Sequence, residues 1–376
     1  MGKQHLGNKL SGQQDFEHGR KPLLGILVVN LGTPDEPTPA AVRRYLAEFL
    51  SDSRVVEIPK VIWKVILHGI ILRIRPAKSA RAYQKVWTEE GSPLMVASSQ
   101  LVDEISKELA TQLDAPFKIE LAMRYGQPSI ESGLKTLEAA GAERIIVLPL
   151  YPQYSGATIG SVADAVFKSL MKWRWVPEIT LMGGYYDNPQ YISAIAESIR
   201  DHWSREGQSD KLLISFHGMP KATLLAGDPY YCHCHKTARL IAEKLGLEEN
   251  QWEMAFQSRF GAATWLQPYV SQRLSELPGE GVKKLSVVCP GFAVDCLETL
   301  EEIALEGHED FIAAGGESFD YIPALNTSSA HVEMFVNRLV QQAVGNSLHE
   351  NGNADNTIDI QLDQTRDLAL AAGASK

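Results

Sequence analysis

The sequence predicts an α/β protein with parallel sheets, organised as two halves of one design. Three observations support this class. Apolar runs of strand length alternate with segments of helical period. The strand runs resemble one another in pairs. A chain of 376 residues is also long enough for two domains with cores of their own. Strands that are covered on both faces by crossover helices read as continuous apolar runs, as these do.

The first predicted strand, LLGILVVNLG (23–32), is an apolar run that ends in glycine. The segment PAAVRRYLAEFL (39–50) follows as a helix, because its large apolar residues fall on one face. These residues are Val42, Tyr45, Leu46, Phe49 and Leu50. Further strands are predicted, in order, at KIELAMRYG, ERIIVLPLYP, EITLMGGYY, KLLISFHG, WEMAFQSRFG, KKLSVVCPGF and FDYIPALN. Amphipathic stretches such as HKTARLIAEKLG separate most of them.

The pairing of these runs indicates an internal duplication. ILVVNLGTP aligns with LLISFHGMP, IELAMRYG with WEMAFQSRFG, and RIIVLPLYP with KLSVVCPGF. Common strand composition is the alternative explanation, and different strand orders in the two halves would exclude duplication. The first half is longer by about 45 residues, because Pro34 and Pro149 lie 115 residues apart whereas Pro220 and Pro290 lie 70 apart. We expect most of this excess within 53–97.

This alignment makes Leu31 and His217 equivalent, each at the carboxyl end of the first strand of its half. Ligands of open α/β sheets bind beyond those ends. The cleft between the halves is therefore the expected place for chemistry.

The expected domains follow from these patterns. Polar, weakly patterned ends predict disordered tails at 1–20 and 345–376, and the opening residues lack the apolar core of a signal peptide. An N-terminal lobe is expected at 21–186, with 53–97 as a lip insertion. A C-terminal lobe is expected at 187–325, and a helix at 326–344 that packs back on the body.

Composition and missing motifs exclude several classes of function. Bases number 36 and acids 46, and this net charge of −10 argues against general nucleic-acid binding. Four cysteines are too few for a disulfide scaffold and suit a reducing cytosol. The turn after the first strand, NLGTPDEP, contains no Walker loop or GxGxxG fingerprint, and the chain has no GxSxG elbow.

Two clusters of residues are candidates for chemistry. His217 follows a buried run and precedes a glycine, and imidazole serves as a proton acceptor or a metal ligand. A packed histidine without a catalytic role is the alternative. After Pro290, a row of acids is spaced for one face of an α-helix: Asp295, Glu298, Glu302 and Glu306. The helix dipole accounts for the first acids, and the rest form either a solvated face or a path for protons or divalent cations.

Two other segments have more than one interpretation. Cys232, His233, Cys234 and His235 are adjacent, but they lack the usual spacing of a zinc site, and a helix-entry loop with incidental thiols is favoured. Residues 60–85 mix apolar and basic side chains over too short an apolar length to cross a bilayer. Three interpretations are open for this segment. It lies at a membrane surface, it forms the lip over an apolar ligand that carries acidic groups, or it is a core helix with a basic outer face.

Taken together, the ordered motifs NLGTP, AMRYG, LPLYPQYS, SFHGMP, FQSRFG, CPGF and DCLETLEEI resemble the ferrochelatase family, and most of all its Gram-negative bacterial branch. The likeness covers about Pro22 to Leu339. It implies two Rossmann-like, doubly wound, chelatase-like lobes around a central cleft. It also implies insertion of Fe²⁺ into protoporphyrin IX, which forms protohaem and releases two protons at the end of haem biosynthesis.

The resemblance also implies roles for individual residues. His217 and Glu298 match the pair that faces the porphyrin from opposite sides, is implicated in metal binding and is proposed to receive the pyrrole protons. Asp295, Glu302 and Glu306 form the associated relay. Pocket-lining positions match Leu31, Arg124, Tyr125 and Tyr151. Positions that hold the porphyrin propionates match Arg75, Tyr83 and Ser92, although the local spacing differs there.

The chain departs from the family pattern at two places. Cys296 stands where some members have a histidine two residues before the glutamate. Animal-type members hold a [2Fe–2S] cluster, but here no cysteine follows Cys296, and Gly156 occupies the corresponding upstream position. We expect no cluster and no tightly bound cofactor, with Fe²⁺ as a substrate.

Protoporphyrin IX and ferrous iron are the expected partners, without nucleic acid. The expected location is the cytoplasm, with peripheral contact of 60–85 at the inner face of the cytoplasmic membrane. A chelatase for coproporphyrin or a cobalt-accepting precursor, or a porphyrin or haem carrier without catalysis, would use the same cleft.

Overall fold

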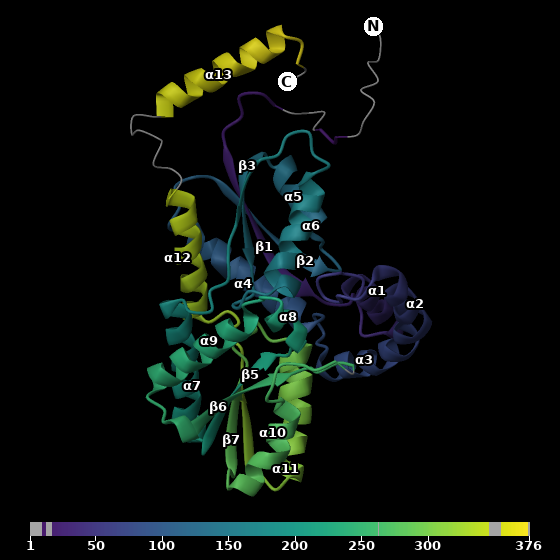
Figure 1. The fold of residues 1–376 in the computed structure, drawn as a ribbon. Coiled ribbons are helices and arrows are strands. Elements are labelled where there is room, and N and C mark those ends of the chain that lie inside the picture. Colours follow the sequence, from purple (N-terminus) through teal and green to yellow (C-terminus); the bar gives the residue numbers. More distant parts are fainter. Residues whose placement is uncertain (1–9, 13–16, 262, 346–354, 375–376) are drawn as a thin grey trace.

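The computed structural model describes residues 10–12, 17–261, 263–345 and 355–374. It contains two four-stranded parallel sheets, arranged one above the other along the long axis of the molecule (Figure 1). Every strand expected from the sequence is present. The α/β class with two similar lobes is thus confirmed.

The first lobe is built on a sheet of order β2-β1-β3-β4. Its strands are β1 (Leu23–Gly32), β2 (Phe117–Tyr125), β3 (Ala142–Pro149) and β4 (Glu178–Leu181). The central strand β1 is buried on both faces, and its Val28 lies opposite Leu121 of β2 and Leu148 of β3. This double burial explains the continuous apolar run in its sequence.

The second lobe repeats the same order, β6-β5-β7-β8. Its strands are β5 (Lys211–His217), β6 (Trp252–Gln257), β7 (Lys284–Val288) and β8 (Ser318–Ile322). The turns after β2 and β6 also match, because the amide of Met123 donates to the Pro128 carbonyl and that of Phe256 to the Pro268 carbonyl. Identical strand orders support the duplication and do not follow from composition alone.

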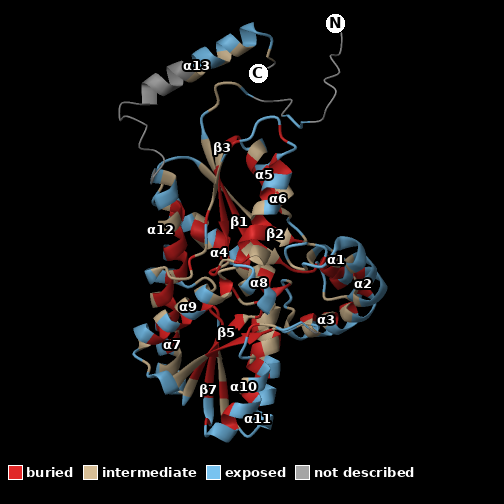
Figure 2. Ribbon diagram, viewed as in Figure 1, coloured by how far each residue is buried: buried red, intermediate tan, exposed pale blue. Residues whose placement is uncertain are grey.

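Helices cover both faces of each sheet. One face of the two sheets shares a single core with α4 (Pro93–Leu109), α7 (Pro189–Glu206), α9 (Tyr230–Leu245) and α12 (Ser329–Gly345). Helix α12 packs against α4 and α7. The opposite faces carry α5 (Ile130–Ala139) and α6 (Ser161–Leu170) in the first lobe, and α10 (Val270–Glu276) and α11 (His308–Ala313) in the second. Because one core spans both lobes, their relative position is fixed by packing (Figure 2).

An extra helical segment stands off the side of the first lobe between β1 and α4 (Figure 1). It consists of α1 (Pro39–Phe49), α2 (Lys60–Ile66), a π-helical turn η1 (Leu67–Ile71) and α3 (Leu72–Val86). In the second lobe, the same connection holds only α8 (Lys221–Leu225) before α9. Most of the extra length thus falls within 53–97.

The chain ends are more ordered than their polar sequences suggest. Residues 1–9, 13–16, 346–354 and 375–376 of the expected tails lie outside the described residues. Ser11 forms a β-bridge with Trp173, and Asp355–Ala371 forms helix α13. Good helix formers and an Arg366–Asp363 pair explain α13 in a stretch without strong hydrophobic patterning. The expectation of loose structure is wrong at these two places.

Candidate functional site

The two lobes contact each other at the carboxyl ends of their strands. Gln153, just after β3, donates its side-chain amide to the carbonyl oxygen of Pro290, just after β7, over 3.1 Å. The Tyr191 hydroxyl donates to the same carbonyl over 2.7 Å. The loop ends that commonly bind ligands in α/β proteins therefore come from both lobes at one junction.

His217 ends β5 at this junction and is half-buried. Its Nδ1 lies 2.7 Å from the carbonyl oxygen of Gly218. A carbonyl only accepts, so this contact places the proton on Nδ1 and leaves Nε2 with a free lone pair in the neutral ring. Tyr230 donates to the backbone carbonyl of His217 over 2.9 Å and fixes the strand end.

The acidic row lies on a π-helix, η5 (Glu298–Gly307), rather than on the α-helix that its spacing predicted. In a π-helix the hydrogen bonds run from i to i+5, so residues four apart no longer stack in a straight line. Glu302 faces Ser258 after β6, whereas Glu306 lies 3.8 Å from Lys85 of α3. The row therefore fans out from the junction towards the extra segment.

Asp295 is not brought into line with this row. Its carboxylate accepts hydrogen bonds from the Tyr321 hydroxyl (2.6 Å), the Thr299 hydroxyl (2.9 Å) and the Asn326 amide (2.8 Å). These contacts tie the start of the π-helix to β8 and to the loop after it. The position of Asp295 is that of a structural carboxylate.

Gln257 links His217 to the acidic row. It lies opposite His217 in the β5–β6 ladder, and its side-chain amide donates to the Glu298 carbonyl over 2.8 Å. The backbone amide of Ser258 donates to Glu302 over 2.6 Å. Burial raises the pKa of Glu302, and the charge of Glu298 reinforces the rise, while Ser258 and His217 oppose it. His217, Glu298 and Glu302 thus occupy one electrostatic neighbourhood.

The extra segment faces Glu298 with two tyrosines and one arginine. Burial raises the pKa of Tyr45 (α1) and of Tyr83 (α3), and the charge of Glu298 adds to both rises. The Arg75 guanidinium stacks on Phe260 at 4.2 Å. Burial lowers the pKa of Arg75, and Glu298 partly opposes this. The sequence pattern indicates only a helix-face position for Tyr45, because a tyrosine on an apolar face carries no functional signal.

The other two predicted propionate contacts meet at Thr33. The Thr33 hydroxyl donates to Ser92 over 2.7 Å, and it also shares a hydrogen bond with Tyr83. Ser92 is only 4% exposed. These hydroxyls join the β1 loop, α3 and the start of α4 into one wall near Arg75.

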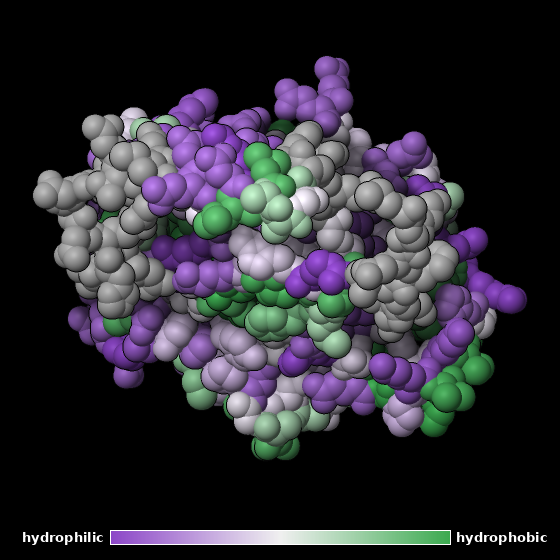
Figure 3. Space-filling view, turned by 90° about the horizontal axis from the view of Figure 1, so that it is seen from above, coloured by the Kyte–Doolittle hydropathy of each residue, from purple (hydrophilic) through white to green (hydrophobic). Residues whose placement is uncertain are grey.

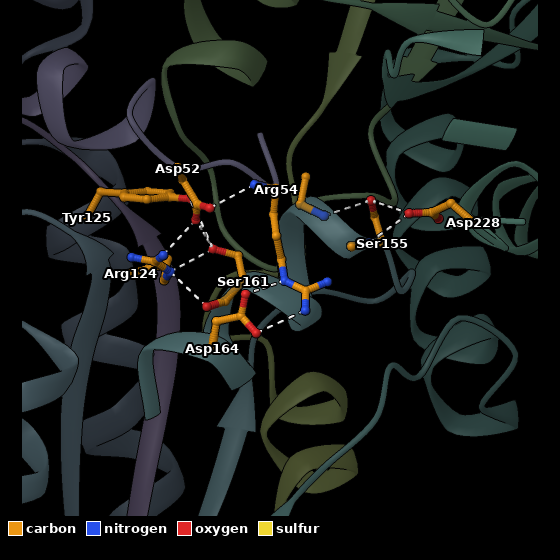
Figure 4. Close-up of polar contacts among 10 residues, drawn as sticks. Asp52, Arg54, Arg124, Tyr125, Ser155, Ser161, Asp164 and Asp228 are labelled. Atoms are coloured by element: carbon orange, nitrogen blue, oxygen red, sulfur yellow. Dashed lines mark hydrogen bonds and ion pairs between the residues drawn. The ribbon is translucent and has the colours of Figure 1, made fainter. Parts of the chain in front are cut away.

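The predicted pocket residues at the ends of β2 and β3 also gather. Arg124 and Tyr125 both contact Asp52, which precedes α2 (Figure 4). Tyr151 lies beside them, with its hydroxyl buried and without a hydrogen-bond partner among the described residues. Leu31 packs into the same region. Asp52 was missed, because a lone aspartate in SDSR reads as an ordinary turn residue.

The Cys–His cluster is not assembled into a site. His233 stacks on Tyr186 at 3.7 Å, His235 tilts onto Tyr231, Cys234 is buried and Cys232 is exposed. Within the described ranges, no group of three or more His, Cys, Asp or Glu side chains is placed to hold a metal ion. Nor does any described helix have the length and apolar content needed to span a bilayer.

Comparisons with known proteins identify relatives over nearly the whole chain. The ferrochelatase family model matches residues 24–343. The ferrochelatase of Thioalkalivibrio sulfidiphilus is 54% identical over 90% of this chain and 91% of its own. That of Nitrosococcus oceani is 50% identical over 97% and 99%. Among solved structures, SirB from Bacillus subtilis with Fe³⁺ has a TM-score of 0.50 at 14% identity, covering 87% of this chain and 98% of SirB, which supports the fold alone.

Proposed function

The chain belongs to the ferrochelatase family, and we propose that the porphyrin into which it inserts Fe²⁺ is protoporphyrin IX. The reaction yields protohaem and two protons in the last step of haem biosynthesis. It makes the chain a lyase that forms nitrogen–metal bonds, with iron as substrate. The family match spans both lobes, so it includes every element that contributes to the junction.

The observation that carries the mechanism is the meeting of His217, Glu298 and Glu302 at the carboxyl ends of the second sheet. Metal insertion removes two pyrrole protons, which need an acceptor beside the macrocycle. With its Nδ1 proton donated to the Gly218 carbonyl, His217 presents Nε2 as that acceptor. Glu298 supplies a carboxylate for the arriving cation from the π-helix.

Glu302 suits the onward transfer of protons. Because its pKa is raised towards neutral pH, the Glu302 carboxyl exchanges protons more readily than an ordinary glutamate. The hydrogen bonds from Ser258 hold it in place. Glu306 continues the row towards Lys85 at the protein surface.

Iron chelation tests this proposal directly. Anaerobic Fe²⁺ or Zn²⁺ with protoporphyrin should give repeated turnover in the wild type. Replacing Glu298 with Gln should lower kcat by roughly a hundredfold while porphyrin binding, followed by fluorescence quenching, persists. Stoichiometric quenching without turnover in the wild type would instead identify a carrier. Preference for coproporphyrin over protoporphyrin would overturn the substrate assignment.

The cofactor expectation has its own test. The four cysteines lie at the start of α9 and after β7, and three of them are buried. The anaerobically purified protein should show no bridging-sulfide bands in its ultraviolet-visible spectrum. Such bands would contradict the proposal that iron is only a substrate.

A membrane surface is the proposed partner of the extra segment, placing the protein at the inner face of the cytoplasmic membrane. Val61 is 81% and Val65 is 70% exposed, and Ile62, Ile70 and Ile74 extend this apolar surface. Exposed Lys60 and Lys64 flank it. Hydrophobic atoms also gather at the lower right of Figure 3, on the side where α2 lies. Exposed apolar residues beside lysines suit an anionic lipid surface.

Binding to vesicles of stated composition measures this contact. The wild type should sediment with vesicles containing anionic phospholipid, and a Val61→Ser/Val65→Ser variant should lose most of that binding. Phe167→Ser/Met171→Ser is the matched control, because it removes a comparable exposed apolar pair at the C-terminal end of α6, where Met171 is the residue after the helix. Equal loss in both variants, or no binding by the wild type, would refute the proposal.

A further inference from the structure

The Asp52 carboxylate accepts hydrogen bonds from four different residues. It lies within the extra segment, between α1 and α2. Its Oδ2 accepts hydrogen bonds from the Arg124 guanidinium (2.6 Å), the Tyr125 hydroxyl (2.8 Å) and the Ser161 hydroxyl (2.5 Å). The backbone amide of Arg54 donates to Oδ1 over 2.8 Å. Figure 4 shows these donors converging on one carboxylate.

This carboxylate cancels the charge of Arg124 inside the protein. The Asp52 side chain is 10% exposed and that of Arg124 is 16% exposed, so water screens the pair only weakly. Burial by itself raises the pKa of Asp52, but the hydrogen bonds from Ser161, Arg54 and Tyr125 and the charge of Arg124 outweigh it and lower the pKa. Asp52 is therefore an anion at neutral pH. The Asp52–Arg124 pair at the end of β2 therefore carries no net charge.

Arg75, on the extra segment, is in the opposite situation. It stacks on Phe260, and none of the described carboxylates forms an ion pair with it. Burial lowers the pKa of Arg75, and the charge of Glu298 only partly opposes this fall. A buried guanidinium that lacks an ion-pair partner is strongly stabilised by a ligand carboxylate, which it binds in a bidentate manner.

On the basis of the proposed function, we infer that Asp52 is a positioning residue that determines substrate specificity. By neutralising Arg124, it confines substrate carboxylates to the side of Arg75. The wall at Arg124 and Tyr125 then receives an uncharged edge of the macrocycle. Protoporphyrin fits this arrangement because its two carboxylates lie at one edge of the ring. Coproporphyrin instead has four carboxylates distributed around the ring. Asp52 thus disfavours the porphyrin with the larger number of carboxylates.

The substitution Asp52→Asn tests the inference because it removes the charge and keeps the shape. Freed from its counter-ion, Arg124 should attract a carboxylate. The ratio of kcat/KM for coproporphyrin to kcat/KM for protoporphyrin should rise about tenfold, mainly through KM. A purely structural role would lower both values together and leave the ratio unchanged.

Three further variants isolate the charge. Asp164→Asn releases Arg54 from an exposed ion pair close by, and the ratio should stay at the wild-type value. Ser161→Ala removes the hydrogen bonds of the Ser161 hydroxyl with Asp52, Arg124 and Tyr125 but leaves the Asp52–Arg124 ion pair, so it should also keep the ratio. Asp52→Asn/Arg124→Gln removes both charges and should restore the wild-type ratio.

The single variant Arg124→Gln removes the positive charge of the same pair instead of the negative one. It tests the inference even if Asp52→Asn does not fold. The uncompensated Asp52 should then repel carboxylates and lower the ratio below that of the wild type. An unchanged ratio in Arg124→Gln, or in a folded Asp52→Asn, overturns the inference while leaving the chelatase activity standing. A wild type that metallates neither porphyrin overturns the proposed function, and the inference falls with it.

Discussion

The ends of β1 and β5 carry different side chains on the same backbone design. A glycine lies against the neighbouring strand at each end: Gly32, the last residue of β1, beside Tyr125, and Gly218, just after β5, beside Gln257. The residue before that glycine is Leu31 in the first lobe and His217 in the second. The first lobe adds helices α2 and α3. After the third strand of each lobe there is a π-helix, which is a five-residue turn in the first lobe (Gly156–Gly160) and a ten-residue helix with the acids in the second. The repeated scaffold thus supplies the geometry, and the chemistry comes from the side chains in which the two copies differ.

The largest expected difference between these positions is catalytic. His217→Ala should reduce chelation by about a thousandfold, because it removes the proton acceptor, while porphyrin binding and folding persist. Leu31→Ala at the equivalent place should cost less than about tenfold, mostly in the KM for porphyrin. Steady-state zinc or iron insertion separates the two. Near-normal turnover in His217→Ala would remove this histidine from the mechanism.

The two glycines differ in the strain that a side chain would bring. Gly32 has a φ of +111°, and a Cβ there would lie 1.8 Å from the Tyr125 carbonyl oxygen. At Gly218 the corresponding distance to the Gln257 carbonyl oxygen is 2.7 Å, and its φ is not positive. Gly32→Ala should therefore destabilise the fold by about 4 kcal/mol and Gly218→Ala by about 2 kcal/mol.

Thermal unfolding of these two variants measures the difference. A larger loss of stability in Gly218→Ala than in Gly32→Ala would show that the tighter approach lies in the second lobe.

A third pair of equivalent positions differs in its response to pH. Tyr191 and His331 are each the third residue of the helix after the last strand of their lobe, and both are fully buried. Burial lowers the pKa of His331 from 6.5 to about 4. Between these values the unfolded chain binds the proton and the folded chain does not, so stability present above pH 6.5 is lost as the pH falls towards 4.

The expected loss from His331 is about 3 kcal/mol over this interval. Denaturant unfolding at pH 7 and pH 4.5 should show a smaller drop for His331→Gln than for the wild type. If both proteins lose the same stability, His331 contributes nothing to the acid sensitivity.

The parts that were predictable from the sequence share a short-range signal. Continuous apolar runs predicted all eight sheet strands of the described residues, since burial on both faces leaves no polar alternation. Paired motifs revealed the duplication, and the spacing of the matched prolines located the extra segment. His217 was identified as a candidate because an imidazole after a buried run stands out.

The parts that escaped prediction depend on tertiary contacts. The π-helix was expected to be an α-helix, because acids three and four apart match the ordinary period and a wider turn leaves no mark in the sequence. Asp295 looked like a member of the row, but its partners Tyr321 and Asn326 lie about 30 residues further along the chain. Asp52 acts through Arg124 and Ser161, which are 72 and 109 residues away.

We expect His217 and Glu298 to face one macrocycle from opposite sides at the junction of the lobes. A crystal structure of the protein with bound protoporphyrin tests it most directly. We predict that the ring lies between these two side chains, with its carboxylates towards Arg75 and an uncharged edge against Arg124. A porphyrin bound elsewhere, or with both side chains on one side of the ring, would exclude this arrangement.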